Sequence, residues 1–565
     1  MEEYPYQPII NISGICAAHG MKEAVLSPGS RCAPLTLAFT RHPTINTYTI
    51  TDERSAGFIG LGLAQQTGKL VGLVCTSGTA ASNYGPAIAE AFYQHVPLIA
   101  FTADRPPEWL DQLDGQTIRQ QNLHANHVKG FFQLPVDYSH PDAKWHIQRT
   151  ISEAINLATT FPQGPVQVNV PFREPFYPTA SQQFEIENPE NIILEEDSEQ
   201  VLSELVWEKL KTEAQGYRKI LLVAGQGKRD EKLLDALRKS GLPVVSDVIS
   251  NASELENAIR HQDAFLARAD LHEELKPDLI VSFGKSVISK NLKLFLRKNK
   301  PAAHWHTQPA GQVADTFQSL TKILRCEPAY FFTEAREKEL FQPETSFTER
   351  WKNVDEQTRN FTNEFLGSKP DNEFSFVKEL MQNLPQNVSF HLANSMSVRY
   401  ANFVNQLPEG AEVWANRGTS GIDGSNSSAV GHALASPEKL HVLLTGDLAF
   451  FYDRNAFWNK YLPPNLKIIL LNNKGGGIFR MIPGPVAQPE LEEYFVTSSH
   501  LDASYLCQEF GMDYFQSNSV FEGKIHLKRF WEVGSVQSLL EFGSDGKQGQ
   551  EIFQEFKGEV KNLQF

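Results

Sequence analysis

The sequence predicts an α/β protein of three domains, each built on a largely parallel sheet flanked by helices. Short β-branched runs such as LVGLVCTSG alternate with longer segments of helical period in the first third of the chain, which is typical of βαβ units. The same alternation returns in the middle and in the last third. The length of 565 residues exceeds what one hydrophobic core usually spans, so several domains are expected.

The first block is expected to cover residues 1–178. Its strands are predicted at EAVLS, TYTIT, LVGLVCTSG, VPLIAFTAD and QVNVP, with helices such as SAGFIGLGLAQQ between them. The stretch that follows, TASQQFEIENPENIILEEDSEQ, is polar and acidic without periodicity. It is interpreted as a linker along the surface.

The second block is expected over 195–335, where KILLVAGQG, LPVVSDVIS and DLIVSFG read as strands. A charged segment with spaced aromatic residues then predicts a connecting helix. The third block, 370–565, repeats the alternation in GAEVWANRG, KLHVLLTGD and LKIILLNNKGGG. Blocks one and three therefore look like two copies of one architecture.

Composition narrows the classes of partner. The net charge is -15, and no run of Lys and Arg is long enough to follow a phosphate backbone, so nucleic acid and anionic membranes are excluded in favour of small-molecule substrates. The five cysteines are scattered without a CxxC pair, which indicates small buried residues in a reducing compartment. No segment reaches the ~18 apolar residues of a membrane span, and the start is acidic. A cytoplasmic enzyme without stable membrane insertion is expected.

Polar side chains end two apolar strands of the third block. LLTGDLAF ends in Gly446 and Asp447, and KIILLNNKGGGIF ends in Asn472 and Asn473. Ligands of parallel sheets bind outside the carboxyl ends of the strands, and oxygens of this kind suit Mg²⁺ on a diphosphate. The glycines of KGGG allow close approach of the backbone to phosphate. Either motif alone is also compatible with a capped strand end and a tight turn.

Together the two motifs resemble the cofactor site of thiamine-diphosphate-dependent enzymes. The resemblance implies that Asp447, Asn473 and the carbonyl of Gly475 bind Mg²⁺, or Mn²⁺ in its place. It further implies cofactor contacts by Gly446 and Leu448. Ile422, in NRGTSGIDGSNSS, matches the apolar residue that supports the bent cofactor in this family.

Glu53 is the expected catalytic residue. TITDERSAGFIGLGLA presents Glu53 at a strand end before a helix, as in family members, where such a glutamate binds the pyrimidine ring nitrogen and favours removal of the thiazolium C2 proton. Taken alone, a glutamate in this place is more commonly an acid that the helix dipole favours at a helix N-terminus. Family members build each cofactor site between two subunits, so a homodimer or a dimer of dimers is implied.

Further motifs resemble the carboligases of menaquinone (vitamin K2) biosynthesis within that family. They are SPGSRCAPLTLA, TADRPPE, ANRGTSGIDG and TGDLAFFYDRNA. The resemblance implies a transferase that decarboxylates 2-oxoglutarate and adds the succinyl-semialdehyde carbanion to isochorismate. Another thiamine-diphosphate decarboxylase or carboligase is the alternative within the class, and a binding protein on a retired enzyme scaffold is the alternative outside it.

Both implied substrates are dicarboxylates, for which Arg is the natural ligand. Any one of the cations taken alone is more simply a surface ion pair. The matching positions depart from the family at Gly115 and Asn291. The implied substrate-binding residues are Ser30, Arg31, Arg105, Gln116, Lys290, Ser395, Arg399 and Arg417, with Ile478 and Phe479 as an apolar wall or as core.

Overall fold

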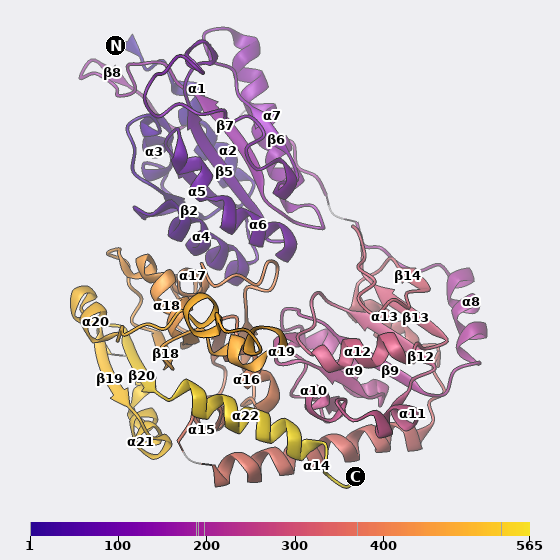
Figure 1. Cartoon of the computed structure of the whole chain (residues 1–565). Coiled ribbons are helices and arrows are strands. Elements are labelled where there is room, and N and C mark those ends of the chain that lie inside the picture. The colour runs from indigo at the N-terminus through magenta and orange to yellow at the C-terminus, as the bar shows by residue number, and fades with distance from the viewer. Residues whose placement is uncertain (1, 188, 190, 197, 370, 533) are drawn as a thin grey trace. The chain divides into compact units, whose positions relative to one another are not determined.

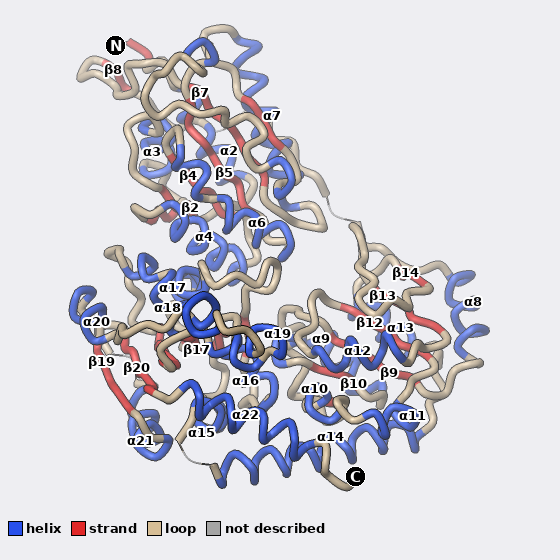
Figure 2. The backbone as a smooth tube through the Cα atoms, in the orientation of Figure 1, coloured by secondary structure: helices blue, strands red, loops and turns tan. Residues whose placement is uncertain are grey.

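The computed structural model describes every residue except 1, 188, 190, 197, 370 and 533 (Figure 1). The expected domain starts at 1 and 370 therefore lie outside the described residues. The chain contains three six-stranded sheets, each flanked by helices, so the predicted fold class is confirmed (Figure 2). No helix of the described part has the length and apolar character needed to cross a membrane. The five cysteines are free and buried, as predicted.

The chain divides into two compact units, which are described separately. Unit 1 consists of residues 1–197, 416–438 and 449–466, and unit 2 consists of 198–415, 439–448 and 467–565. Unit 1 contains one of the six-stranded sheets and unit 2 contains the other two.

The sheet of unit 1 has the order β3-β2-β4-β5-β7-β6. Its apolar strands β4, β5 and β7 are fully buried, as expected for a sheet covered on both faces. A short pair, β1 (Glu2–Glu3) and β8 (Gln182–Gln183), lies outside it. The strands are β2 (Glu23–Leu26), β3 (Asn46–Thr49), β4 (Val71–Cys75), β5 (Leu98–Asp104), β6 (Phe131–Gln133) and β7 (Val166–Pro171). The helices are α1 (Gln7–Ile10), α2 (Ile12–Ala18), α3 (Ala33–Thr40), α4 (Glu53–Thr67), α5 (Thr79–Asn83), α6 (Gly85–Gln94), α7 (Pro141–Thr159) and α17 (Ser425–Ala435).

The first sheet of unit 2 has the order β11-β10-β9-β12-β13-β14. The long helix α14 (Thr345–Ser368) follows it, where the charged segment with spaced aromatic residues predicts a helix. The strands are β9 (Ile220–Ala224), β10 (Val244–Ser246), β11 (Ala258–Ile259), β12 (Leu279–Phe283), β13 (Ala303–Thr307) and β14 (Lys322–Leu324). The other helices are α8 (Glu204–Ala214), α9 (Glu231–Ser240), α10 (Gln262–Phe265), α11 (His272–Leu275), α12 (Lys290–Lys298) and α13 (Pro328–Glu337).

The second sheet of unit 2 has the order β16-β15-β17-β18-β20-β19. Counted along the chain, this order of strands is the same as in unit 1, whereas the first sheet of unit 2 has a different one. The strands are β15 (Ser389–Leu392), β16 (Glu412–Trp414), β17 (His441–Gly446), β18 (Leu466–Asn472), β19 (Asp513–Ser517) and β20 (Ser538–Gly543). The helices are α15 (Glu373–Gln382), α16 (Met396–Val404), α18 (Asp447–Tyr452), α19 (Pro483–Val486), α20 (Ser504–Phe510), α21 (Val520–Phe530) and α22 (Gly546–Val560).

Candidate active site

The two polar strand ends of the third block lie on neighbouring strands. β17 and β18 are adjacent in the sheet; β17 ends at Gly446, directly before Asp447, and β18 ends at Asn472, directly before Asn473. Asn472 is satisfied within the protein, because its Nδ2 donates to Glu541 Oε1 at 2.7 Å and to the Leu501 carbonyl at 3.0 Å. The second asparagine is therefore the one whose oxygen stays available.

Asp447 and Asn473 each leave one buried oxygen without a hydrogen-bond partner among the described residues. These atoms are Asp447 Oδ2 and Asn473 Oδ1. Burial raises the pKa of Asp447 to about 6, and the backbone N–H groups of Leu448 and Gly475 act in the opposite direction. Buried oxygens without partners are rare in folded proteins, so this pair suits a divalent cation. The residues present fit the metal and diphosphate that the sequence predicts.

The sequence offered no signal for Glu373, which binds one of these residues. Glu373 is the first residue of α15 and is buried, and its Oε1 accepts a hydrogen bond from Asn473 Nδ2 at 3.0 Å. Burial raises the pKa of Glu373 to about 7, and the charge of Asp447 raises it further. An acceptor on the amide nitrogen turns Asn473 Oδ1 to the other side. A contact across 100 residues leaves no local pattern to detect.

The turn after β18 needs its glycines for close packing. A Cβ on Gly475 would lie 2.7 Å from Val496 Cγ1, and the Gly476 N–H donates to the Val496 carbonyl at 2.7 Å. Lys474 has a positive φ of 64°. The turn is therefore packed against Val496, and the backbone of Gly475 lies beside Asp447, as expected for the proposed metal motif.

Glu53 lies in unit 1 at the first position of α4. Asp52 caps this helix, since its Oδ1 accepts from Arg54 N at 2.9 Å and from Ser55 N at 3.5 Å. Asn455 Nδ2 donates to the other oxygen of Asp52 at 2.8 Å. Because Asp52 serves as the cap, the half-buried carboxylate of Glu53 is not needed for that role.

Besides Arg417, four of the expected substrate residues belong to unit 1. Arg31 is buried, donates to the Phe172 carbonyl at 2.7 Å, and has its pKa lowered by burial and by Arg105 nearby. Arg105 pairs with Asp114 at 3.0 Å and donates to the Gly115 carbonyl at 2.6 Å. The two arginines therefore lie close together, with part of their donors engaged by the protein. Ser30 and Gln116 are exposed, the latter with a positive φ of 56°.

In unit 2 the structure brings Ser395, Arg399 and the start of α12 into one region. Arg399 Nη1 donates to the Ser395 carbonyl at 2.6 Å; burial raises the pKa of Asp263, and the charge of Arg399 acts in the opposite direction. Asn291, where the family often has Arg, binds the same aspartate: its N–H donates to Asp263 Oδ1 at 2.9 Å and its Nδ2 to the Asp263 carbonyl at 2.6 Å. Asn291 therefore has a structural role, whereas Lys290 beside it is exposed.

The remaining expected residues are half-buried. Arg417 and Ile422 lie in the loop before α17, in unit 1. Ile478 packs against the hydrophobic core of unit 2, and the ring of Phe479 lies 5.9 Å from that of Phe495. Ile478 and Phe479 were expected either to form an apolar wall or to belong to the core, and the contacts within the protein are those of core packing.

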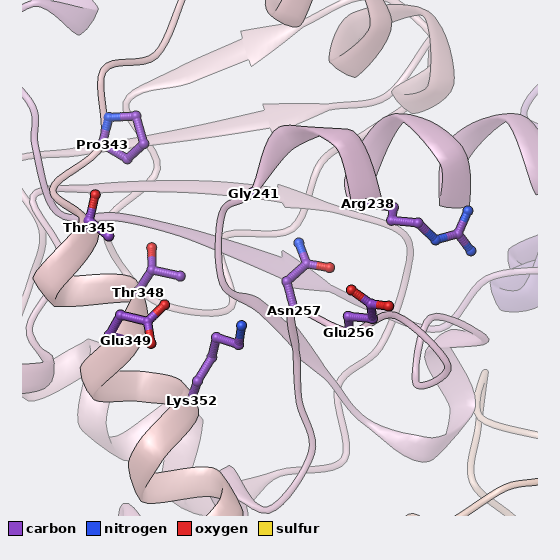
Figure 3. A pocket seen from close by; sticks show the side chains of 9 residues that line it. All are labelled: Arg238, Gly241, Glu256, Asn257, Pro343, Thr345, Thr348, Glu349 and Lys352. Atoms are coloured by element: carbon purple, nitrogen blue, oxygen red, sulfur yellow. The ribbon is translucent and has the colours of Figure 1, made fainter.

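A cavity elsewhere in unit 2 does not contain any of these residues. It has a volume of about 240 Å³ and lies by α9 and the start of α14 (Figure 3). Figure 3 shows charges of both signs around it, from Arg238, Glu256, Glu349 and Lys352. A surface lined in this way is typical of solvated ion pairs. The candidate site in unit 2 is instead formed by the neighbouring ends of β17 and β18.

Comparison with known proteins agrees with this geometry. A family model described as "thiamine pyrophosphate enzyme, N-terminal TPP binding domain" matches residues 11–136, and one described as "middle domain of thiamine pyrophosphate" matches 191–392. Together the two models cover more than half of the chain. The protein therefore belongs to the thiamine-diphosphate-dependent enzymes.

Curated relatives identify one enzyme family within this class. A protein of Cytophaga hutchinsonii is 44% identical over 98% of this chain and 99% of its own length, one of Flavobacterium johnsoniae is 38% identical over 94% and 95%, and one of Porphyromonas gingivalis is 37% identical over 92% of each. All three are named 2-succinyl-5-enolpyruvyl-6-hydroxy-3-cyclohexene-1-carboxylate synthase. The chain belongs to this synthase family, as the sequence predicts.

Proposed function

We propose that this protein decarboxylates 2-oxoglutarate and joins the remaining four-carbon unit to isochorismate, releasing CO₂ and forming 2-succinyl-5-enolpyruvyl-6-hydroxy-3-cyclohexene-1-carboxylate for menaquinone synthesis. One observation supports it above the others. Asp447 Oδ2 and Asn473 Oδ1 are buried without partners at neighbouring strand ends, as a cation on a diphosphate would require.

The cofactor residues follow from that pair. Asp447, Asn473 and the Gly475 carbonyl would hold Mg²⁺ or Mn²⁺, with Gly446 and Leu448 beside the diphosphate and Ile422 against the cofactor. Thiamine diphosphate supplies an electron sink for decarboxylation when it is bound. Glu53 would hold a proton against the pyrimidine ring nitrogen. It is available for this acid-base role because Asp52, and not Glu53, caps helix α4.

The substrate residues would read carboxylates by charge. Arg31 with Arg105, and Arg399 with Ser395, form two pairs within their own units, to which Lys290 and Arg417 add positive charge. Ser30 and Gln116 would donate further hydrogen bonds, and Ile478 and Phe479 would border the ring of isochorismate. Charge-assisted hydrogen bonds to carboxylate are the strong ones, so these cations would decide the preference for dicarboxylates.

The assembly and the location belong to the same proposal. We propose a homodimer or a dimer of dimers in the cytoplasm, with Glu53 from one subunit and Asp447 from another completing each site. The proposed domains are a pyrimidine-binding domain at 1–178, a central domain at 195–335 and a diphosphate-binding domain at 370–565. The separate sheets support these bounds.

One assay tests the function. Purified protein with isochorismate, 2-oxoglutarate, thiamine diphosphate and Mg²⁺ should consume isochorismate and yield a product of the expected mass. Pyruvate in place of 2-oxoglutarate is the control and should give little turnover. A preference for pyruvate would replace the proposal by a general carboligase of the same class.

A further inference from the structure

Glu90 on α6 is a buried carboxylate outside every set of residues named above. Its side chain has no exposed surface. Oε1 accepts hydrogen bonds from the Gly418 N–H at 2.8 Å and from Gln94 Nε2 at 3.0 Å. Oε2 accepts from the Thr419 N–H at 2.6 Å and from Thr419 Oγ1 at 2.7 Å. Four donors therefore meet the two oxygens of one buried side chain.

The loop that Glu90 binds is also tightly seated on its neighbours in unit 1. A Cβ on Gly418 would lie 2.9 Å from the Glu90 carbonyl oxygen and 3.0 Å from Tyr93 Cβ. A Cβ on Gly424 would come within 2.2 Å of the Phe58 ring on α4. Ser420, between them, has a positive φ of 61°. Loop 417–424 therefore has little freedom where it meets α4 and α6.

We propose that Glu90 is a positioning residue, which fixes loop 417–424 so that Arg417 is held in place to bind a substrate carboxylate. The inference rests on the proposed function, which assigns Arg417 to substrate. Gly418 and Thr419 directly follow Arg417, and the backbone N–H groups of both donate to Glu90. These two hydrogen bonds therefore fix the backbone immediately after Arg417. These contacts offset, before substrate arrives, the conformational entropy that is lost when this backbone is fixed.

Glu90→Gln in the full-length enzyme is the informative variant. It keeps the size of the side chain but places an NH₂ group among N–H donors. Because small misplacements of a binding group cost up to about 100-fold in rate, we expect kcat/KM for 2-oxoglutarate to fall about 10- to 100-fold, mainly through KM. Hydrogen exchange of peptides covering 416–424 should become faster in the protein without substrate.

A double-mutant cycle with Arg417→Ala separates positioning from general stability. If Glu90 acts through Arg417, adding Glu90→Gln to Arg417→Ala should lower kcat/KM by less than about threefold more. If the effects of the two substitutions on kcat/KM multiplied, the inference would be overturned. Unchanged hydrogen exchange in loop 417–424 of Glu90→Gln would overturn it too. Faster exchange together with unaltered substrate kinetics for Arg417→Ala would instead contradict the substrate role proposed for Arg417.

Two further comparisons keep the test decisive. Asp453→Asn is the matched control, because Asp453 is also buried in unit 1 and its carboxylate accepts from Ser427 N and Oγ of α17 at 2.7 Å each, not from the backbone of loop 417–424. It should lower the melting temperature while changing kcat/KM by less than about twofold. If Glu90→Gln does not fold, Thr419→Val removes one bond to Glu90 and should lower kcat/KM about three- to tenfold, with parental values in Thr419→Ser. Parental kinetics in Thr419→Val would overturn the inference.

Discussion

The two sheets of unit 2 each place a buried aspartate after a strand, and only one of these aspartates has the features of a site. Asp247 follows β10 and Asp447 follows β17; both are less than 5% exposed, at 1% and 4%. Burial raises the pKa of each to about 6. By burial and pKa alone the two residues are alike.

Their hydrogen bonds separate them. Asp247 Oδ1 accepts from Gln262 Nε2 at 2.7 Å, and its Oδ2 accepts from the N–H groups of Ile288 and Ser289. Asp447 Oδ2 has no such partner, and Asn473 Oδ1 shares that condition. A raised pKa therefore reports desolvation, whereas two oxygens at neighbouring strand ends that have no partner among the described residues suit a shared ligand.

Substitution of the two aspartates gives the largest expected difference. Asp447→Ala removes the charged side chain that is proposed to bind the metal, so we expect thiamine diphosphate binding in Mg²⁺ to be abolished, beyond the roughly 10- to 100-fold that loss of an outer-shell partner costs. Asp247→Asn should bind the cofactor as the parent does. Isothermal titration calorimetry measures both, and unchanged affinity in Asp447→Ala would remove the metal assignment.

The same contrast extends to two acids at helix starts. Glu53 follows the cap Asp52 on α4, and Glu231 follows the cap Asp230 on α9, where it pairs with Arg229 at 2.7 Å. Glu53→Gln should slow proton exchange at the thiazolium C2 by about 10²- to 10⁴-fold while cofactor still binds. Glu231→Gln should have the parental rate. NMR of deuterium exchange on the bound cofactor checks this, and equal rates in the two variants would make Glu53 an ordinary helix-start acid.

Arginines offer a smaller contrast of the same kind. Arg229 is engaged by Glu254 through two hydrogen bonds of 2.7 and 2.8 Å, whereas Arg399 and Arg417 are proposed to bind substrate. Arg399→Ala or Arg417→Ala should each lower kcat/KM for 2-oxoglutarate about 10- to 100-fold, since a charge-assisted hydrogen bond contributes about 1.5–3 kcal/mol. Arg229→Ala should leave it unchanged. Steady-state kinetics decides, and parental values in both substrate variants would favour the general carboligase.

The smallest expected effect concerns the pH dependence of stability at Asp247. Its folded pKa of about 6 lies above the ordinary value of 3.8, so its stabilising contribution is complete below about pH 4 and is lost as the pH rises through 6. Relative to Asp247→Asn, the parent should therefore lose about 1–3 kcal/mol of unfolding free energy between pH 4 and pH 7. Urea denaturation at both pH values measures the difference. Parallel changes in the two proteins would mean that burial does not perturb this carboxyl group.

Local pattern was enough to predict the alternation of strands and helices and the polar residues at two strand ends. The alternation of apolar runs and helical periods predicts the sheets because each depends on neighbours in the chain. The Asp-Glu pairs at 52–53 and 230–231 both stand at a helix start. The identical pairs do not reveal which glutamate is catalytic; that choice came from resemblance over the surrounding residues.

The sequence by itself determined the α/β class, the membership of the family and the residues of its motifs. Only the tertiary structure decided which of these residues form hydrogen bonds within the protein. Asn472 binds Glu541, Asn291 binds Asp263, and Arg31 donates to the Phe172 carbonyl. It also brought forward Glu373 and Glu90, whose partners lie 100 and 328 residues away. Hydrogen bonding acts over about 3 Å in space and is indifferent to separation along the chain, so no local pattern encodes it.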